Sequence, residues 1–412
     1  MKILIVNQPL NNRGDEAAHK ALVRNIHKQF PESKITVMFL KGSKEQKDID
    51  AFNVHETNVK YLRISPYVGW GRAYMLGLCH NLWLFADIHP TVRRLKKEIK
   101  RNDIIVCAPG GICMGGFQNW VHIFILYIAK RLKKDIFYYG RSFGPFPIKT
   151  PLNKRFKEIS YELLHYFKYL SIRDKKTQLL ADEIGIPYIS TTDTAFLESP
   201  NSNIPELVKH IIGNSLYVVI VPNVLIWHYA YKAIPKDKVT YFFCQIIEYV
   251  LHTYPQYKVV MLPQTFNSPV PLRNDINFFY DLQKQLKNDR IIVIPDTFSS
   301  DVQQSIIKNA QFLIGARYHS VVFALNNNVP FVALSYEHKI AGLLELLHKE
   351  DCMVDITNIF SSEDKMKDAL SKVKTLLTVI KKDDEAHKMA KEMAKKAFNE
   401  FVKTVIQSTS KI

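Results

Sequence analysis

The feature that most constrains the fold is a regular alternation of short β-rich runs with helix-length amphipathic stretches. In the first half these runs are KILIVNQ (2–8), KITVMFL (34–40), DIIVCAPGG (103–111), DIFYYGRSFGP (135–145) and YLSIRD (169–174). In the second half they are SLYVVIVPN (215–223), YKVVMLPQ (257–264), RIIVIPD (290–296), FLIGARYHS (312–320) and PFVALSY (330–336). Strands that alternate with helices form right-handed βαβ units and parallel sheets. About ten such strands predict an α/β chain with two Rossmann-like, doubly wound domains.

The domain boundaries follow from where this alternation is interrupted. We expect an N-terminal domain over 1–200 and a second domain over 215–360, because Pro, Asn and Ser residues break the pattern between 197 and 215. From Ser361 onward the chain reads as two Lys-rich amphipathic helices, which we assign to a C-terminal segment over 361–412.

Composition limits the location and the partners of the chain. The 56 basic and 39 acidic residues give a formal charge of +17, which favours nucleic acid, an anionic membrane surface or an anionic small substrate as partner. The five cysteines are scattered and odd in number, which argues against a disulfide framework or a zinc site. The N-terminus fits a buried strand better than a signal peptide, and no run reaches the roughly 18 apolar residues of a membrane span. We therefore expect a cytoplasmic protein.

The segment 61–101 departs from the alternation and is expected to be a helical insertion. It combines aromatic residues, among them Trp70, Trp83 and Phe85, with a basic run over 93–97. A buried helix followed by a solvated one would produce this pattern, and apolar helical stripes usually belong to the core. An interfacial helix, with its aromatic residues in a membrane and its cations at anionic head groups, would produce it as well.

In open parallel sheets, ligands bind outside the carboxyl ends of the strands, so the residues that follow each strand are the candidates for a site. Asp15 follows the first strand and is a candidate helix N-cap; the alternative is that a carboxylate, Asp15 or Glu16, acts on a sugar hydroxyl. Gly110 and Gly111 follow a later strand, where they would let the backbone approach a ligand or simply form a tight turn. Arg141 and Arg173 lie in two further loops, where each is either solvated or ligand-binding.

The stretch RYHSVVFALNNNVPFVALSYEHK (317–339) gives the strongest signal. Arg317 and His319 follow one strand, and Lys339 follows the next. These strands are expected to be neighbours in the sheet, so the three cations should reach one crevice close to a helix that starts near Ser320. A helix N-terminus adds unpaired N–H groups and a favourable dipole, so this arrangement predicts an anion-binding site.

These residues resemble the polysaccharide pyruvyl transferases. The stretch 317–339 is similar to that family's Arg-x-His, Val-Pro and Tyr-x-x-Lys elements. The family's other elements lie earlier in the chain, in the order in which they occur in the family. They are a Gly-Asp turn at Gly14, the Pro-Gly-Gly turn, a Gly-x-Ser-x-Gly-Pro loop at 140–145, an Arg-Asp pair at Arg173 and an Asp-x-Ala element at Asp193. Arg141 stands where glutamine would be expected. The resemblance covers residues 1 to about 345.

The resemblance implies a glycosyltransferase-B-like architecture with two facing Rossmann-like halves. It also implies an enzyme that transfers pyruvate from phosphoenolpyruvate to two hydroxyls of a sugar, forming a cyclic ketal on a bacterial capsular or exopolysaccharide precursor. The acceptor would be an oligosaccharide linked to a polyprenyl diphosphate, met at the inner face of the cytoplasmic membrane. No cofactor or metal is expected, because phosphoenolpyruvate is itself the donor substrate and the cations can neutralise it.

Chemistry suggests a role for each candidate. His319 is the predicted proton donor and acceptor, since a histidine titrates near neutral pH. Asp15 is the predicted group that orients or deprotonates the acceptor. The phosphate and carboxylate of the donor would be held by cationic side chains and by polar groups at strand ends, namely Arg317, Lys339, Arg173, Arg141, Ser320, Gly110 and Gly111.

Two other functions are consistent with the same pattern. A nucleotide-sugar-dependent glycosyltransferase of the same architecture would use the cations to hold a diphosphate. A basic non-catalytic protein would bind nucleic acid or anionic lipid. We expect no nucleic-acid partner, because the Lys and Arg residues are spread along the chain without a recognition motif.

Overall fold

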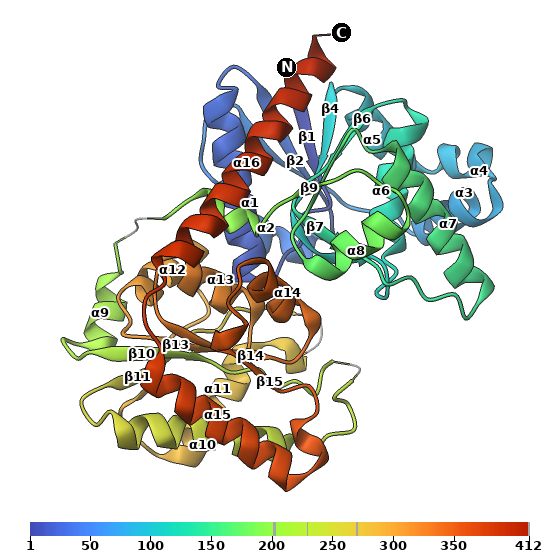
Figure 1. Cartoon of the computed structure of the whole chain (residues 1–412). Coiled ribbons are helices and arrows are strands. Elements are labelled where there is room, and N and C mark those ends of the chain that lie inside the picture. The colour runs from blue at the N-terminus through green and yellow to red at the C-terminus, as the bar shows by residue number, and fades with distance from the viewer. Residues whose placement is uncertain (201–202, 229, 269–270, 411–412) are drawn as a thin grey trace. The chain divides into compact units, whose positions relative to one another are not determined.

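A computed structural model describes residues 1–200, 203–228, 230–268 and 271–410. The chain forms two compact units (Figure 1). Unit 1 comprises Met1–Leu10, Ala18–Leu197 and Glu392–Ile412. Unit 2 comprises Asn11–Ala17 and Glu198–Lys391. The first turn of helix α1 and the first turns of helix α16 therefore belong to unit 2, although the rest of each helix belongs to unit 1.

Within the described residues, unit 1 is built on a seven-stranded sheet in which every pairing is parallel. The strand order is β3 (Val59–Ile64), β2 (Lys34–Leu40), β1 (Lys2–Val6), β4 (Ile104–Cys107), β6 (Asp135–Tyr138), β8 (Tyr169–Ile172) and β9 (Ile189–Ser190). A small two-stranded sheet pairs β5 (Gly110–Met114) with β7 (Arg141–Phe143). The central strands are rich in Ile and Val and are buried on both faces, as parallel sheets require.

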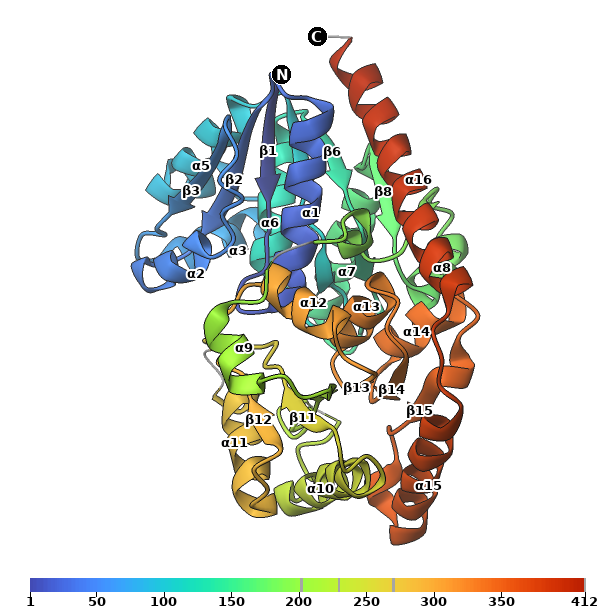
Figure 2. The same ribbon diagram turned by 90° about the vertical axis from the view of Figure 1, so that its left-hand side faces the viewer.

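Helices cover both faces of this sheet. One face is covered by α1 (Arg13–Gln29) and α16 (Asp384–Thr409), which lie in front of the strands in Figure 2. The opposite face is covered by α3 (Trp70–His80), α4 (Trp83–Ile88), α5 (Pro90–Lys100), α6 (Trp120–Arg131), α7 (Pro151–Tyr166) and α8 (Lys175–Glu183). The short helix α2 (Gln46–Asp50) follows β2.

Helix α16 completes the core of unit 1. The ring of Phe401 packs edge-on against Phe137 and Tyr139, with ring centroids 5.5 and 5.3 Å apart. The Tyr169 hydroxyl donates a hydrogen bond of 2.7 Å to the Ala397 carbonyl. These three aromatic residues come from β6, β8 and the residue after β6, so α16 is an integral layer of the N-terminal fold.

Within the described residues, unit 2 contains a six-stranded parallel sheet. Its order is β12 (Ile291–Val293), β11 (Lys258–Met261), β10 (Tyr217–Val221), β13 (Leu313–Gly315), β14 (Phe331–Ser335) and β15 (Met353–Asp355). Figures 1 and 2 show α12 (Ser300–Lys308), α13 (Tyr318–Asn326) and α14 (His338–Leu346) on one face, and α10 (Lys236–Thr253), α11 (Asp275–Leu286) and α15 (Glu363–Val379) on the other. Helix α9 (Glu206–Ile212) precedes β10.

The structure differs from the expected boundaries in three places. The segment 361–412 forms two helices as expected, but α15 and the start of α16 belong to unit 2 and the rest of α16 to unit 1. The segment 61–101 begins inside the edge strand β3 and is helical only from Trp70. Residues 11–17, expected in the first domain, belong to unit 2. The division after Leu197 falls within the stretch 197–215 where it was expected, and residues 201–202 of that stretch lie outside the described residues. In the described part of the chain, no helix is both long and apolar enough to cross a bilayer.

His19 is a buried titratable group in unit 1, and its burial should make the stability of the fold depend on pH. Its ring nitrogens lie 2.9 Å from Gln8 Oε1 and 2.9 Å from the Tyr61 hydroxyl. Burial, followed by the charges of Lys20 and Arg24, lowers the pKa of His19 from 6.5 to about 3. The imidazole is therefore neutral in the folded chain and protonates below pH 6.5 only after unfolding.

We expect stability to fall as the pH drops from 7 to 5, because the unfolded state binds an extra proton at His19 in this range. The contribution of His19 to that loss is about 2 kcal/mol. His19→Gln, which cannot titrate, should show a smaller loss of unfolding free energy between the two pH values in urea titrations. An equal loss in both proteins would contradict this assignment.

Candidate functional site

The turn that carries Arg317 and His319 lies at the carboxyl end of β13, in the middle of the sheet of unit 2. Strand β13 pairs with β10, and the connections after these two neighbours lead to opposite sides of the sheet. Such a switch point is where open parallel sheets bind ligands. Arg317 is the N-cap residue of α13, and His319 lies in its first turn. Ser320 is buried, and its hydroxyl donates a hydrogen bond of 2.6 Å to the Arg317 carbonyl.

Arg317 forms a buried ion pair with Asp275 at the start of α11. The Arg317 Nε donates to Asp275 Oδ1 at 3.1 Å, and Nη2 contacts the same oxygen. Asp275 Oδ2 also accepts hydrogen bonds of 2.9 Å from the backbone N–H groups of Gln264 and Thr265. Burial disfavours the guanidinium charge, but the Asp275 carboxylate opposes this and the pKa of Arg317 is raised overall. The pair fixes the orientation of the guanidinium.

An aromatic ring and a second arginine complete this part of the site. The guanidinium carbons of Arg273 and Arg317 lie 4.9 and 5.6 Å from the centre of the Trp227 ring. The Trp227 indole N–H donates a hydrogen bond of 2.9 Å to Asn223 Oδ1, and this bond holds the ring in place. Trp227 and Asn223 follow β10, so these contacts join residues after β10 to residues after β13. The Trp227 ring therefore attracts both guanidinium charges through cation–π contacts.

Lys339 lies in the first turn of α14, after the neighbouring strand β14. Its Nζ is 3.1 Å from Glu337 Oε1, and the other oxygen of Glu337 is 3.9 Å from His228 Nε2. Burial opposes ionisation of Glu337, but Lys339 outweighs it and lowers the pKa of that carboxyl. The predicted cations of unit 2 therefore do follow adjacent strands, and Arg317 and Lys339 each have a carboxylate partner.

The segment Asn11–Ala17 packs in unit 2, beside His319. The backbone N–H of Arg13 donates a hydrogen bond of 2.8 Å to the Gln264 carbonyl, and the backbone N–H of Phe266 donates one of 3.1 Å to the Asn11 carbonyl. A Cβ added to Gly14 would lie 1.7 Å from His319 Cγ and 1.9 Å from Nδ1. The His319 ring therefore occupies the space that any side chain at position 14 would need.

Asp15 is not the N-cap of α1, so that interpretation was wrong. Asn12 is the cap, because its Oδ1 accepts hydrogen bonds from the backbone N–H groups of Gly14 at 2.8 Å and Asp15 at 3.2 Å. Asp15 lies in the first turn of the helix, one residue from Gly14, and is half-buried. Its predicted action on the acceptor stays a prediction, and the structure places it in the same unit as His319.

Glu16, the next residue, is buried and stabilises the fold around the first turn of α1. It is fully buried, and its Oε2 pairs with Arg13 Nη1 at 2.6 Å. Its Oε1 accepts from the backbone N–H and the hydroxyl of Ser300, at 3.0 and 3.1 Å. The first turn of α1 is thereby joined to the N-terminus of α12, and this contact holds Gly14 against His319.

The other predicted site residues, Gly110, Gly111, Arg141 and Arg173, belong to unit 1. Arg173 is buried and forms an ion pair with Asp193. Arg141 is also fully buried, in β7 and not in the surface loop that was expected. Its Nη1 lies 3.1 Å from His122 Nδ1, and its Nη2 donates 3.2 Å to the Asn7 carbonyl. Burial, followed by the charge of Arg141, lowers the pKa of His122 well below its ordinary value.

Gly110 and Gly111 differ in what surrounds them. Gly110 has a φ of +156°, and a Cβ there would lie 2.5 Å from Arg141 Nη2, so the buried arginine requires glycine at this position. A Cβ at Gly111 would meet no atom within 4 Å. Only Gly111 therefore leaves open space beside the backbone for a ligand.

A cavity of about 300 Å³ lies at the carboxyl end of the unit 1 sheet. Residues after β1, β2 and β5 line it together with the start of α3 and of α6, and they include Asn7, Gln8, Lys41, Trp70, Asn119 and His122. The lining combines the amides of Asn7, Gln8 and Asn119 with the rings of Phe39 and Trp70 and with aliphatic side chains, and Lys41 carries its one fixed charge, which suits a sugar better than an anion. In the described part of the chain, no three His, Cys, Asp or Glu side chains are grouped to hold a metal ion.

Several of these residues were missed by the sequence analysis. Trp227 follows β10, Arg273 precedes α11 and Asp275 is the first residue of α11, and no motif marks them. Trp70 was noticed only as part of an aromatic segment. The available signal was the position of Asn223 at the end of the apolar run 215–223 and of Trp227 shortly after it, because that run lies beside the run that precedes Arg317.

Comparisons with solved structures confirm the α/β, glycosyltransferase-B-like fold class. The UDP-GlcNAc 2-epimerase of Neisseria meningitidis, solved with UDP-GlcNAc, superposes with a TM-score of 0.59 at 11% identity, covering 99% of this chain and 100% of that one. The α,α-trehalose 6-phosphate synthase of Burkholderia multivorans gives a TM-score of 0.52 at 11% identity, covering 99% of each chain. At these identities the likeness concerns the fold alone.

Comparisons of sequence identify the family. The amylovoran biosynthesis protein AmsJ of Erwinia amylovora is 21% identical over 384 residues, which cover 87% of this chain and 89% of that protein. The model of the family described as polysaccharide pyruvyl transferase matches residues 12–338, which include the turn at Gly14, the buried pair at Arg173 and the 317–338 stretch. The chain therefore belongs to the polysaccharide pyruvyl transferase family, and it is a transferase that acts in polysaccharide modification.

Proposed function

We propose that this enzyme transfers pyruvate from phosphoenolpyruvate to two hydroxyls of one sugar in a capsular or exopolysaccharide precursor. The products are a cyclic pyruvate ketal and inorganic phosphate. The observation that carries the proposal is the group of cationic residues at the switch point of the unit 2 sheet. Arg317 and His319 lie at the N-terminus of α13, and Lys339 lies at the N-terminus of α14.

The chemistry of the donor fits this group. Phosphoenolpyruvate carries a phosphate and a carboxylate close together, and planar guanidinium groups contact either one through two hydrogen bonds. Arg317 and Arg273 both lie close to the Trp227 ring, and the N-terminus of α13 adds backbone N–H groups. Lys339 supplies a further positive charge. Its carboxylate partner Glu337 would keep the site close to neutral before the donor binds.

A single residue, acting first as general acid and then as general base, accounts for the proton transfers of the reaction. His319 gives a proton to the methylene carbon, and the first sugar hydroxyl attacks the resulting cationic carbon. The C–O bond to phosphate breaks, and the second hydroxyl closes the ring. One of the two hydroxyl protons restores His319 and the other leaves with phosphate. Arg317 stabilises the charge that develops on the departing phosphate. Asp15 orients or deprotonates the acceptor.

We place the acceptor sugar in the 300 Å³ cavity of unit 1. Trp70 offers an aromatic face for a pyranose ring, and Asn7, Gln8 and Asn119 offer amide groups for its hydroxyls. We further propose that the sugar is linked to a polyprenyl diphosphate at the inner face of the cytoplasmic membrane. The buried pair Arg173–Asp193 and the Arg141–His122 contact would then keep the loops around the cavity in place.

The test is incubation of the enzyme with phosphoenolpyruvate and a panel of lipid-linked sugars. We expect one acceptor to gain the mass of a pyruvate ketal, with one phosphate released for each ketal formed. Phosphate release without a modified acceptor, or no reaction with any sugar of the panel, would contradict the proposal.

A nucleotide-sugar-dependent glycosyltransferase is the second candidate, because the fold is shared with enzymes solved in complex with UDP-GlcNAc. Thermal unfolding in the presence of each donor separates the two. A ligand that binds the folded state raises the melting temperature. We expect phosphoenolpyruvate to raise it and UDP-sugars to leave it unchanged; the reverse pattern would favour the second candidate.

Arg317→Lys should weaken donor binding by about tenfold, because lysine keeps the charge but loses the planar, bidentate group. The variant also leaves Asp275 with fewer hydrogen bonds, so a modest fall in melting temperature should accompany the loss. Titration of phosphoenolpyruvate, followed by the rise in melting temperature, measures the change. Arg290→Lys is the matched control, because Arg290 also contacts backbone carbonyls in unit 2 but at the opposite end of its sheet. An unchanged donor affinity would remove Arg317 from the donor site.

A further inference from the structure

Helix α4 exposes large apolar side chains that its own unit does not cover. Trp83 and Ala86 face the core of unit 1, whereas Leu84 is 85% exposed and Phe85 and Ile88 are each 60% exposed. Figure 1 shows α3 and α4 at the periphery of unit 1. Solvent-exposed apolar side chains that gather in one place usually mark an interaction surface.

A neighbouring loop adds to this patch. Val68 is fully exposed and precedes α3 by two residues. The Val68 carbonyl lies 3.2 Å from His89 Nε2, and the backbone N–H of Tyr67 donates 2.9 Å to the Thr91 hydroxyl. These two contacts place the loop beside the junction of α4 and α5, so Val68 lies next to the end of α4.

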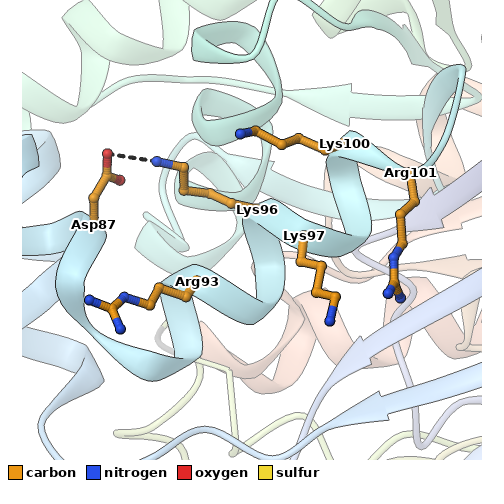
Figure 3. A pocket seen from close by; sticks show the side chains of 6 residues that line it. All are labelled: Asp87, Arg93, Lys96, Lys97, Lys100 and Arg101. Atoms are coloured by element: carbon orange, nitrogen blue, oxygen red, sulfur yellow. Dashed lines mark hydrogen bonds and ion pairs between the residues drawn. The ribbon is translucent and has the colours of Figure 1, made fainter.

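Helix α5, which follows directly, is strongly basic. Its eleven residues, PTVRRLKKEIK, include five basic residues and one acidic one. Figure 3 shows Arg93, Lys97 and Arg101 leaving the helix on one side, at intervals of one turn, where they line a surface depression. The acidic side chains of this region are already paired, since Asp87 lies 2.7 Å from Lys96 and Glu98 lies 2.9 Å from Arg101. The surface is therefore basic overall.

We infer that the α4–α5 surface, formed by Val68, Leu84, Phe85, Ile88, Arg93, Lys97 and Arg101, docks on an anionic phospholipid bilayer. The apolar side chains would enter the boundary between head groups and acyl chains, and the cations would contact the anionic head groups. Charge complementarity selects this occupant, because apolar residues beside a basic helix match a negatively charged bilayer surface.

The inference rests on the proposed function in one respect. Val68 is two residues before Trp70, which lines the cavity that we assign to the acceptor sugar. A bilayer under the α4–α5 surface would bring a lipid-linked sugar close to that cavity. The docking surface would thereby serve as the entrance for a membrane-bound acceptor.

Flotation with vesicles tests the inference directly. With the unmodified chain we expect binding to vesicles of 30% phosphatidylglycerol in phosphatidylcholine, weak binding to phosphatidylcholine alone, and release at high salt. Replacing three cations by glutamine should lower the partition coefficient by about 100-fold, since each contributes roughly fivefold; the variant is Arg93→Gln, Lys97→Gln and Arg101→Gln. The matched control changes three exposed lysines of α15, Lys367→Gln, Lys372→Gln and Lys374→Gln, and should bind as the unmodified chain does.

A second variant tests the apolar part, with the changes Leu84→Ser, Phe85→Ser and Ile88→Ser. It should also lose binding, whereas its control, with exposed leucines changed elsewhere, should not; the control is Leu152→Ser, Leu179→Ser and Leu207→Ser. Both surface variants should keep the melting temperature and its rise with phosphoenolpyruvate. Failure of the unmodified chain to bind anionic vesicles, or equal binding by variants and controls, would overturn the inference. The phosphoenolpyruvate response reports on the proposed function separately, so either can fail alone.

Discussion

His319→Ala should lower the rate of acceptor-dependent phosphate release by about 10²- to 10⁴-fold, the range expected when a general acid–base group is removed. The donor should still bind, because Arg317 and Lys339 remain in place. Rates measured over a range of phosphoenolpyruvate concentrations should therefore show a loss in kcat with little change in KM for the donor.

The matched control is His210→Ala, which removes an exposed imidazole from α9 in the same unit. This control should retain full activity. If His319→Ala turned over at a near-normal rate, His319 would have no part in proton transfer, and the proposed mechanism would need another acid.

Gly14→Ala should lower kcat/KM by at least about 100-fold, because the new methyl group takes the space of the His319 ring. The Cβ would come within 1.7 Å of Cγ, so the imidazole must move by more than an ångström. Displacing a reacting group by that distance costs about 10²-fold in rate. Overpacking should also lower the free energy of unfolding by about 1–3 kcal/mol. Steady-state kinetics and urea unfolding measure the two effects.

A double-mutant cycle shows whether the two residues act through this contact. The three atoms nearest to the added methyl group all belong to His319, so His319→Gly should abolish the destabilisation caused by Gly14→Ala. Gly116→Ala is the control, since a Cβ there would meet no atom within 4 Å. Additive effects in the cycle would contradict the contact.

The long buried strands could be predicted from the sequence because each is an uninterrupted apolar run. Strand β10, for instance, reads YVVIV and is buried at every position. The edge strand β3 was missed because VKYLRI is half-buried and carries two basic residues, so no continuous run marks it. Strand β15 has three residues, too few for a periodic pattern. Edge strands are identified by their partners, which sequence periodicity does not reveal.

For the site, local motifs could be predicted and long-range partners could not. Arg317 and His319 were found because the glycine-ended strand and the helix start lie within one short stretch. Asp275 is 42 residues from Arg317, and only folding brings the two together. The choice of Asn12 over Asp15 as the cap depends on the pairing of Asn12 with Thr265, 253 residues away. The local sequence around Asp15 therefore does not identify the cap.

The position of α16 has a consequence for how the chain folds during synthesis. Phe137, Tyr139 and Tyr169 are made early, but the helix that covers them begins to join unit 1 only at Glu392, after the ribosome has completed most of unit 2. Until then the nascent N-terminal domain exposes an aromatic surface to the cell's chaperones and to aggregation. A fragment ending at Leu197 would carry that surface permanently, so the N-terminal half should not be treated as an independently expressible domain.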